Sequence, residues 1–259
     1  MTSSDLALVG LGKTYPTPRG PAVIVEDVEL EVAAGEVVSL IGHSGCGKST
    51  VLSMIAGLIA PSTGEILVGG RVVRGPGVDR GVVFQTPCLL PWLDVVANVT
   101  LGLGGLGTAR ERRGRAERAL VSVGLAEAVN ARPSDLSAGM RQRAALARAL
   151  ALEPRMLLLD EPFGMLDSVT RAELQDLVLA LGGARPTTVL VTHDIDEALL
   201  LSDRVAVMTD GPAARIRAVI DIPFGATRTR ESAVAHPAYD PLREQLLALL
   251  EERGAVRAA

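Results

Sequence analysis

The sequence predicts an α/β fold in which helices cover both faces of a parallel sheet. Three segments contain continuous apolar runs with the composition of buried strands: RMLLLDEP at 155–162, TTVLVTH at 187–193 and RVAVMTDG at 204–211. Segments with helical periodicity lie between them, at 168–182 and 194–202. Because buried strands that alternate with helices are typical of parallel sheets, we expect such a sheet to form the core.

The composition is that of a globular chain without a general affinity for nucleic acid. The 259 residues suffice for one large domain or two small ones, and 48% of them are hydrophobic. The formal net charge of -4 argues against a broad basic surface. The charge run RERRGRAER at 110–118 mixes both signs, and a solvated helix or loop explains it without a nucleic-acid partner.

The cysteine content and the N-terminal sequence favour a reducing cytosol. Cys46 and Cys88 do not suggest a disulfide framework, and MTSSDLALVG does not resemble a signal peptide. The longest stretches without charge, Ser49–Gly64 and Val95–Ala109, are shorter than the roughly 18–20 apolar residues of a membrane span. If the protein works at a membrane, we expect another chain to span it.

Short Val-, Ile- and Leu-rich runs dominate the chain as far as about Val83. The runs at 22–32, 36–42 and 64–70 are separated by glycine and proline, which predicts strands joined by tight turns. The stretch Val51–Leu58 then predicts a helix directly after a glycine-rich loop.

The middle of the chain changes to a helical pattern. The segments 108–125 and 140–152 combine strong helix formers with helical periodicity. Strand patterns return after them. We therefore expect a discontinuous core at 1–85 and 155–215, a helical insertion at 86–154, and a C-terminal tail at 216–259 with a terminal helix.

A glycine-rich loop follows one predicted strand and precedes a predicted helix. GHSGCGKST fits the pattern G-x-x-x-x-G-K-[ST], in which backbone N–H groups and a helix N-terminus cradle phosphates. Lys48 provides a charge for the β- and γ-phosphates, and the Ser49 hydroxyl is a ligand for Mg²⁺. A chance glycine loop is the alternative, but strand, loop and helix follow in the required order. The predicted nucleotide-binding residues of this loop are Gly42, His43, Ser44, Gly45, Cys46, Gly47, Lys48, Ser49 and Thr50.

Acidic and polar side chains follow other predicted strands. Asp160 and Glu161 end the run MLLLDE, where Asp160 suits a Mg²⁺ ligand and Glu161 suits a base for an attacking water. His193 ends TTVLVTH and can hold that water near the γ-phosphate, although strand-end histidines are more often structural. Gln85, in VVFQTP, can contact Mg²⁺ or the water, with a solvated turn residue as the alternative.

A second helix start of the kind that binds anions lies in SDLSAGMRQR. Ser134 and Ser137 are residues of the N-cap type, Gly139 allows close approach of the backbone, and an Ala-, Leu- and Arg-rich helix follows. Since the chain already contains a phosphate loop far upstream, this second start needs a separate explanation.

In this order the motifs resemble those of the nucleotide-binding subunits of ABC transporters, over nearly the whole chain. GHSGCGKST resembles the Walker A loop, MLLLDE the Walker B strand with its catalytic glutamate, FGMLD the D-loop and LSAGM the signature. The resemblance implies a P-loop NTPase: a RecA-like core with a parallel sheet, an ABC helical subdomain and a small antiparallel N-terminal sheet. It also implies roles for single residues: Glu161, His193 and Gln85 in hydrolysis, Ser49, Gln85 and Asp160 at Mg²⁺, Tyr15 against adenine, and Asp167 in nucleotide binding.

The family resemblance also explains the second anion-binding helix start. Two cassettes of this family pack head to tail, so Ser137 and Gly139 of one copy would close over the ATP held by the other copy. Each ATP is then shared, in a homodimer or a heterodimer of cassettes. The sequence departs from the family pattern at Ala138, where a second glycine is usual, and at Met165, where alanine is common.

Further segments resemble one importer branch of the family. VVFQTPCLLPWLDVVANV is similar to members that handle nitrate, sulfonate, taurine, cyanate and bicarbonate, and VMTDGPAARI and HPAYDPLREQLLALL resemble the nitrate/nitrite members. Leu89, Leu90 and Trp92 would suit a groove for a permease coupling helix. Core packing of Trp92 is the alternative.

The resemblance therefore implies an ATPase that energises import of an inorganic anion. Nitrate or nitrite is the expected solute, with sulfonate, taurine, cyanate or bicarbonate as alternatives. ATP and Mg²⁺ are the expected cofactors. The expected partners are an integral membrane permease and, indirectly, a periplasmic solute-binding protein, and the expected location is the cytoplasmic face of the inner membrane, where the chain would be peripheral.

Three rival classes of protein use similar motifs. A soluble ABC ATPase of DNA repair or translation usually carries tandem cassettes, zinc modules or coiled coils, which we do not find. The signature and His193 argue against a small-molecule kinase, and Glu161 argues against a regulator that binds nucleotide without hydrolysing it.

Overall fold

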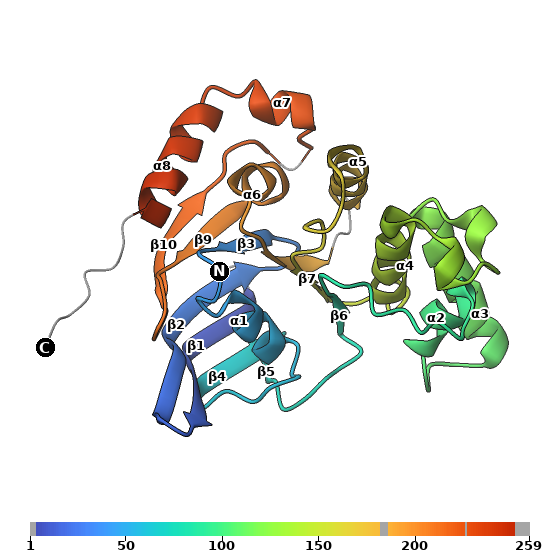
Figure 1. The fold of residues 1–259 in the computed structure, drawn as a ribbon, viewed down its shortest axis with the longest axis horizontal. Coiled ribbons are helices and arrows are strands. Elements are labelled where there is room, and N and C mark those ends of the chain that lie inside the picture. Colours follow the sequence, from blue (N-terminus) through green and yellow to red (C-terminus); the bar gives the residue numbers. More distant parts are fainter. Residues whose placement is uncertain (1–3, 182–185, 226, 252–259) are drawn as a thin grey trace, which may run out of the picture. The chain divides into compact units, whose positions relative to one another are not determined.

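The computed structural model describes residues 4–181, 186–225 and 227–251. The chain forms two compact units, whose elements are labelled in Figure 1. The first unit consists of residues 1–77 and 182–259, and the second of residues 78–181. The boundaries expected for the core, the helical insertion and the tail remain predictions.

A small antiparallel sheet forms the N-terminal part of the first unit. Its strands lie in the order β2-β1-β4-β5 and pair antiparallel throughout. Val28, Leu30 and Val32 of β2 are buried and alternate with exposed glutamates, as expected for a strand with one covered face. The strands are β1 (Ser4–Thr17), β2 (Gly20–Ala33), β4 (Thr63–Val68) and β5 (Arg71–Val72).

A second group of strands in the same unit lies in the order β10-β9-β3-β8. β3 (Val37–Ile41) pairs in parallel with both β8 (Thr187–Val191) and β9 (Arg204–Met208), which confirms the predicted parallel sheet. Every residue of β3 and β8 is buried, which explains their near-continuous apolar sequences. Two helices pack on these strands, α1 (Lys48–Ile55) against β8 and α6 (Ile195–Leu201) against β3.

The C-terminal segment adds a strand and two helices to the first unit. β10 (Ile216–Asp221) pairs antiparallel with β9, and α7 (Arg230–Val234) and α8 (Tyr239–Glu251) follow. Leu246 of α8 is fully buried in a cluster with residues of β3, β9 and α6. α8 lies in the leucine-rich segment for which a terminal helix is expected, and it packs on the sheet core.

The second unit combines a pair of parallel strands with helices. β6 (Arg80–Val83) and β7 (Met156–Asp160) are parallel, and β7 corresponds to the predicted apolar strand that contains MLLLD. The helices at 108–125 and 140–152 are confirmed as α3 and α4. The helices of this unit are α2 (Val95–Leu101), α3 (Ala109–Ser122), α4 (Ala138–Leu150) and α5 (Ser168–Leu179), with short 3-10 turns at Ala126–Ala128 and Pro133–Asp135. Within the described part of the chain, no helix has the length and apolar character needed to cross a membrane.

Candidate functional site

The carboxyl ends of the parallel strands in the first unit carry the glycine-rich loop and His193. Leu40 of β3 lies opposite Val191 of β8, so the two strands end at the same level. The loop begins directly after β3, and His193 follows β8 by two residues with its side chain exposed. The register therefore brings the loop and the histidine to one edge of the sheet, where ligands of α/β proteins usually bind.

The last glycine of the loop is required by both its backbone and its surroundings. Gly47 has φ 101°, a left-handed conformation that favours glycine. A Cβ atom at this position would lie 2.6 Å from Cγ1 of Val25 in β2. Gly47 is also the N-cap of α1 and provides no side-chain cap, so the first N–H groups of α1 face the loop.

Lys48 is buried inside the loop that precedes it. Its side chain is only 4% exposed, and Nζ donates hydrogen bonds to the carbonyl oxygens of Gly42 (2.8 Å) and His43 (3.0 Å). Cys46 Sγ lies 4.0 Å from the same ammonium. Burial raises the pKa of the Cys46 thiol, which favours its neutral form.

The loop after β9 braces the glycine-rich loop. His43 Nδ1 lies 2.7 Å from Asp210 Oδ1, and both side chains are at least partly exposed. Ala213 and Ala214 of the same segment donate backbone hydrogen bonds to Val23 and Ile24 of β2. Asp210 was not predicted as a site residue, and its position in the loop after an apolar strand is the signal that identifies it.

Tyr15 lies on β1 with its ring partly exposed. The ammonium of Lys13 lies 4.9 Å from the ring centroid, close enough for a cation–π contact. An exposed aromatic ring of this kind offers a stacking surface to a flat ligand.

The carboxyl ends of the two parallel strands in the second unit carry Gln85, Asp160 and Glu161. Val83 of β6 lies opposite Leu159 of β7, so the residues after Val83 and Leu159 lie at the same edge of this strand pair. Gln85 Nε2 donates a hydrogen bond to Glu161 Oε2 at 3.3 Å. Glu161 has φ 44°, a conformation that is rare for residues other than glycine and is frequent at functional sites.

Two side chains of α4 hold the backbone on both sides of Gln85. Gln142, which is 2% exposed, donates to the carbonyl of Phe84 at 3.0 Å. Arg148 donates to the carbonyls of Cys88 (2.8 Å) and Pro87 (2.9 Å). The sequence analysis did not select Gln142 or Arg148, because polar residues on an amphipathic helix carry no signal of such a contact.

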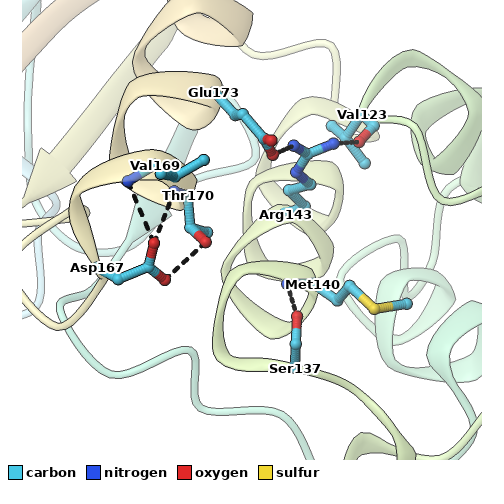
Figure 2. A network of polar contacts seen from close by, with 8 residues as sticks. All are labelled: Val123, Ser137, Met140, Arg143, Asp167, Val169, Thr170 and Glu173. Atoms are coloured by element: carbon cyan, nitrogen blue, oxygen red, sulfur yellow. Dashed lines mark hydrogen bonds and ion pairs between the residues drawn. The ribbon is translucent and has the colours of Figure 1, made fainter.

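The helix starts of α4 and α5 are capped by the predicted residues Ser137 and Asp167. Ser137 Oγ accepts a hydrogen bond from the Met140 amide at 3.2 Å, which confirms the predicted N-cap. Asp167 accepts from the amides of Val169 (3.1 Å) and Thr170 (3.0 Å). Figure 2 shows both caps and the side chains between them. Ser137 and Asp167 are exposed, whereas Gly139 is buried.

An exposed tryptophan lies on the segment before α2. Trp92 is 65% exposed, so the alternative of core packing is wrong. Asn98, fully buried on α2, holds this segment through hydrogen bonds with the Leu90 amide (2.7 Å) and with the carbonyls of Leu90 (3.1 Å) and Leu93 (3.2 Å). The backbone that carries Trp92 is therefore fixed from within the unit.

The comparison with protein families agrees with these motifs. Residues 25–164 match the model of the ABC transporter family. The chain belongs to the ABC transporter family. The matched segment contains the glycine-rich loop, the strand-end carboxylates and the capped start of α4.

Curated relatives of the chain are named for the transport of nitrate or bicarbonate. The chain is 49% identical over 248 residues to the nitrate import ATP-binding protein NrtD of Synechococcus elongatus, covering 94% of this chain and 90% of NrtD. It is 44% identical to the bicarbonate transport ATP-binding protein CmpD of Synechocystis (97% and 91% covered) and to the nitrate transport protein NasD of Klebsiella oxytoca (94% and 95%).

Solved structures support the fold of the cassette and its enzymatic class. The ATP-binding cassette MJ0796, a dimer in a post-hydrolysis state with ADP and phosphate bound, aligns with a TM-score of 0.75 at 33% identity, covering 84% of this chain and 98% of that one. The predicted P-loop NTPase fold is confirmed, as is the prediction of an ATP-hydrolysing subunit of a transporter.

Proposed function

We propose that this cassette energises the import of nitrate or nitrite. The observation that carries the proposal is its identity of 49% with a nitrate import ATP-binding protein, over 94% of the chain. Bicarbonate is the second candidate, because relatives named for bicarbonate transport are 44% identical over a similar length. The sequence segments VMTDGPAARI and HPAYDPLREQLLALL favour nitrate or nitrite.

Hydrolysis requires a charge for the phosphates, a base for the water and a group that orients both. We assign the phosphate charge to Lys48 and the base to Glu161, with Gln85 holding the carboxylate of Glu161 through the 3.3 Å hydrogen bond. His193 is assigned to the attacking water, and Tyr15 to the adenine. The backbone of the loop from Gly42 to Thr50 binds the phosphates.

The residues expected at Mg²⁺ have the right donor chemistry. The Ser49 hydroxyl, the Gln85 amide and the Asp160 carboxylate offer oxygen ligands, which Mg²⁺ prefers together with phosphate oxygens and water. When bound, the ion would supply positive charge to the phosphates. Asp160 ends β7 and Gln85 follows β6, and the parallel pairing of these two strands supports a common site for both residues.

We further propose that two cassettes share each ATP. Ser137 and Gly139 lie at the start of α4, whose N–H groups suit an anion supplied by another copy. Asp167, at the start of α5, is assigned to the binding of the same nucleotide. The dimeric MJ0796 cassette supports this assembly. Either two copies of this chain or this chain and a related cassette would form the pair.

The exposed segment around Trp92 is the proposed contact with an integral membrane permease. Its backbone is fixed by Asn98, while the indole is left outside the fold. A rigid exposed aromatic side chain is a typical anchor of protein interfaces. The cassette would then be peripheral at the cytoplasmic face of the inner membrane, and a periplasmic solute-binding protein would act on the other side of the permease.

Transport assays with the reconstituted complex test the proposal. We expect nitrate or nitrite outside proteoliposomes to stimulate ATP hydrolysis and to be taken up when the solute-binding protein is present. Glu161→Gln removes the general base, so ATP hydrolysis and solute uptake should both fall by a factor of roughly 10²–10⁴. The variant should still bind ATP. Stimulation and uptake with bicarbonate, and none with nitrate or nitrite, would assign the second solute instead.

A further inference from the structure

Thr170 has its side chain fixed by the capping carboxylate of α5. Its hydroxyl donates a hydrogen bond to Asp167 Oδ2 at 2.7 Å, while its own amide donates to Asp167 Oδ1 at 3.0 Å. The two bonds hold the hydroxyl on the side of the cap, as Figure 2 shows. Because threonine is branched at Cβ, a fixed hydroxyl also fixes the direction of the methyl group.

The methyl group of Thr170 lies against Gly139 in the first turn of α4. A Cβ atom built on Gly139 would lie 2.2 Å from Thr170 Cγ2, far inside van der Waals contact. Gly139 is buried and has the helical backbone that any residue adopts. Only glycine fits at position 139, because Thr170 Cγ2 of α5 occupies the space that a Cβ atom would need.

A second contact ties the same two helices one turn further along. Arg143 donates to Glu173 Oε2 at 2.7 Å, and its other terminal nitrogen reaches the Val123 carbonyl at 3.5 Å. Arg143 lies four residues after Gly139, and Glu173 lies three residues after Thr170, so each pair lies on one face of its helix. The starts of α4 and α5 are thus held together at two points, of which Figure 2 shows the Arg143–Glu173 pair.

We propose that Thr170 is a positioning residue that sets the start of the signature helix relative to the D-loop carboxylate. The inference rests on the proposed function, in which Ser137 and Asp167 both act on the nucleotide of the partner cassette. Thr170 links their two helix starts through its hydroxyl on one side and its methyl group on the other. The two elements then meet the partner as one rigid piece, and closure of the dimer does not have to order each of them separately.

Three substitutions separate the two contacts of Thr170. Thr170→Val keeps the methyl group and removes the bond to Asp167, and Thr170→Ser does the reverse. Gly139→Ala places a methyl group against Thr170, and the double variant Gly139→Ala/Thr170→Ser removes the group that it meets. Thr108→Val is the matched control, because it removes a capping hydroxyl from α3 in the same unit.

The decisive measurements are the thermal unfolding midpoint of each full-length variant and its ATP-dependent association in the Glu161→Gln background. We expect Gly139→Ala to lower the midpoint and to weaken association roughly tenfold or more, and Thr170→Ser to reverse most of both losses in the double variant. Thr108→Val should leave the association constant unchanged. If Gly139→Ala is equally impaired with and without Thr170→Ser, Thr170 does not set the position of α4.

The titration of Asp167 provides a readout that general loss of stability does not move. The backbone and then the hydroxyl of Thr170 lower the pKa of the Asp167 carboxyl. Measured by NMR, this pKa should rise in Thr170→Val and stay low in Thr170→Ser. Equal pKa values in both variants would contradict the hydroxyl contact.

Failure of the proposed function gives a different pattern. If two copies of the Glu161→Gln parent do not associate in the presence of ATP and magnesium, the proposal that two cassettes share each ATP is wrong. The role of Thr170 at the partner's nucleotide is then wrong as well. The unfolding midpoints and the Asp167 titration are properties of one chain, so they still decide whether Thr170 sets the spacing of the two helices.

Discussion

Glu161 and Gly139 show how single residues of the site are constrained by their immediate neighbours. Glu161 adopts a left-handed backbone at the end of β7 and receives a hydrogen bond from Gln85. Strain of this kind persists only where the surrounding structure fixes it. Gly139 is constrained by space, because the methyl group of Thr170 occupies the position of a Cβ atom.

A testable consequence at this scale concerns Tyr15. Its exposed ring on β1 is the proposed adenine contact, and stacking of a base on an aromatic ring is worth about 1–3 kcal/mol. Tyr15→Ala should therefore weaken ATP binding about tenfold or more, measured by titration calorimetry in the Glu161→Gln background. Tyr15→Phe keeps the ring and should bind like the parent. Equal affinities of all three proteins would place the adenine elsewhere.

At the scale of elements, the sequence patterns predicted the strands and helices that have strong periodicity. β3, β7, β8 and β9 are almost entirely buried, and strands that are covered on both faces have continuous apolar sequences. This continuous pattern is what makes them recognisable in the sequence. β1 was not identified, because Gly10, Gly12 and Pro16 interrupt its apolar pattern. Its pairing with β2 and β4 is long-range information that a local pattern does not contain.

The polar contacts of the site were less predictable than its motifs. The glycine loop and the strand-end carboxylates have fixed spacing in the sequence, because the strand, loop and helix that present them are contiguous. Gln142, Arg148 and Thr170 contact residues that are distant in the sequence, up to 61 positions away. Only the three-dimensional packing of α4 against α5 and against the segment after β6 reveals what they contact.

The packing of α8 leads to a prediction for the tail as an element. Leu246 is fully buried against α6, β3 and β9, and α8 is also held by hydrogen bonds from Tyr239 (3.0 Å) and Arg243 (2.9 Å) to Asp196. Leu246→Ala should cost about 2–5 kcal/mol of unfolding free energy through the cavity it leaves. The exposed neighbour Gln245 is the matched control, and Gln245→Ala should stay within about 0.5 kcal/mol. Urea unfolding of full-length protein measures both, and equal values would mean that α8 is not part of the core.

At the scale of the whole molecule, one unit carries the glycine loop and His193, and the other carries Glu161, Ser137 and Asp167. A shared nucleotide makes the loop of one copy depend on the signature helix of the other. Lys48→Ala disables the loop, and Ser137→Phe obstructs the exposed signature start. In a pair of identical variants, either change damages both nucleotide sites, so each variant alone should be inactive.

Mixing the two variants should restore hydrolysis, if this chain forms the pair with itself. A mixed pair has one site with both defects and one site with none, because the intact loop of the Ser137→Phe copy meets the intact signature of the Lys48→Ala copy. Half of the pairs in an equal random mixture are mixed, and each has one intact site of two, so activity should recover to at most roughly a quarter of the parent value. A steady-state ATPase assay of the mixture, with each variant alone at the same total concentration as the control, measures this. A mixture that stays as inactive as its components would show that two copies of this chain do not complete each other's sites, and a heterodimer with a second cassette would then be the assembly to test.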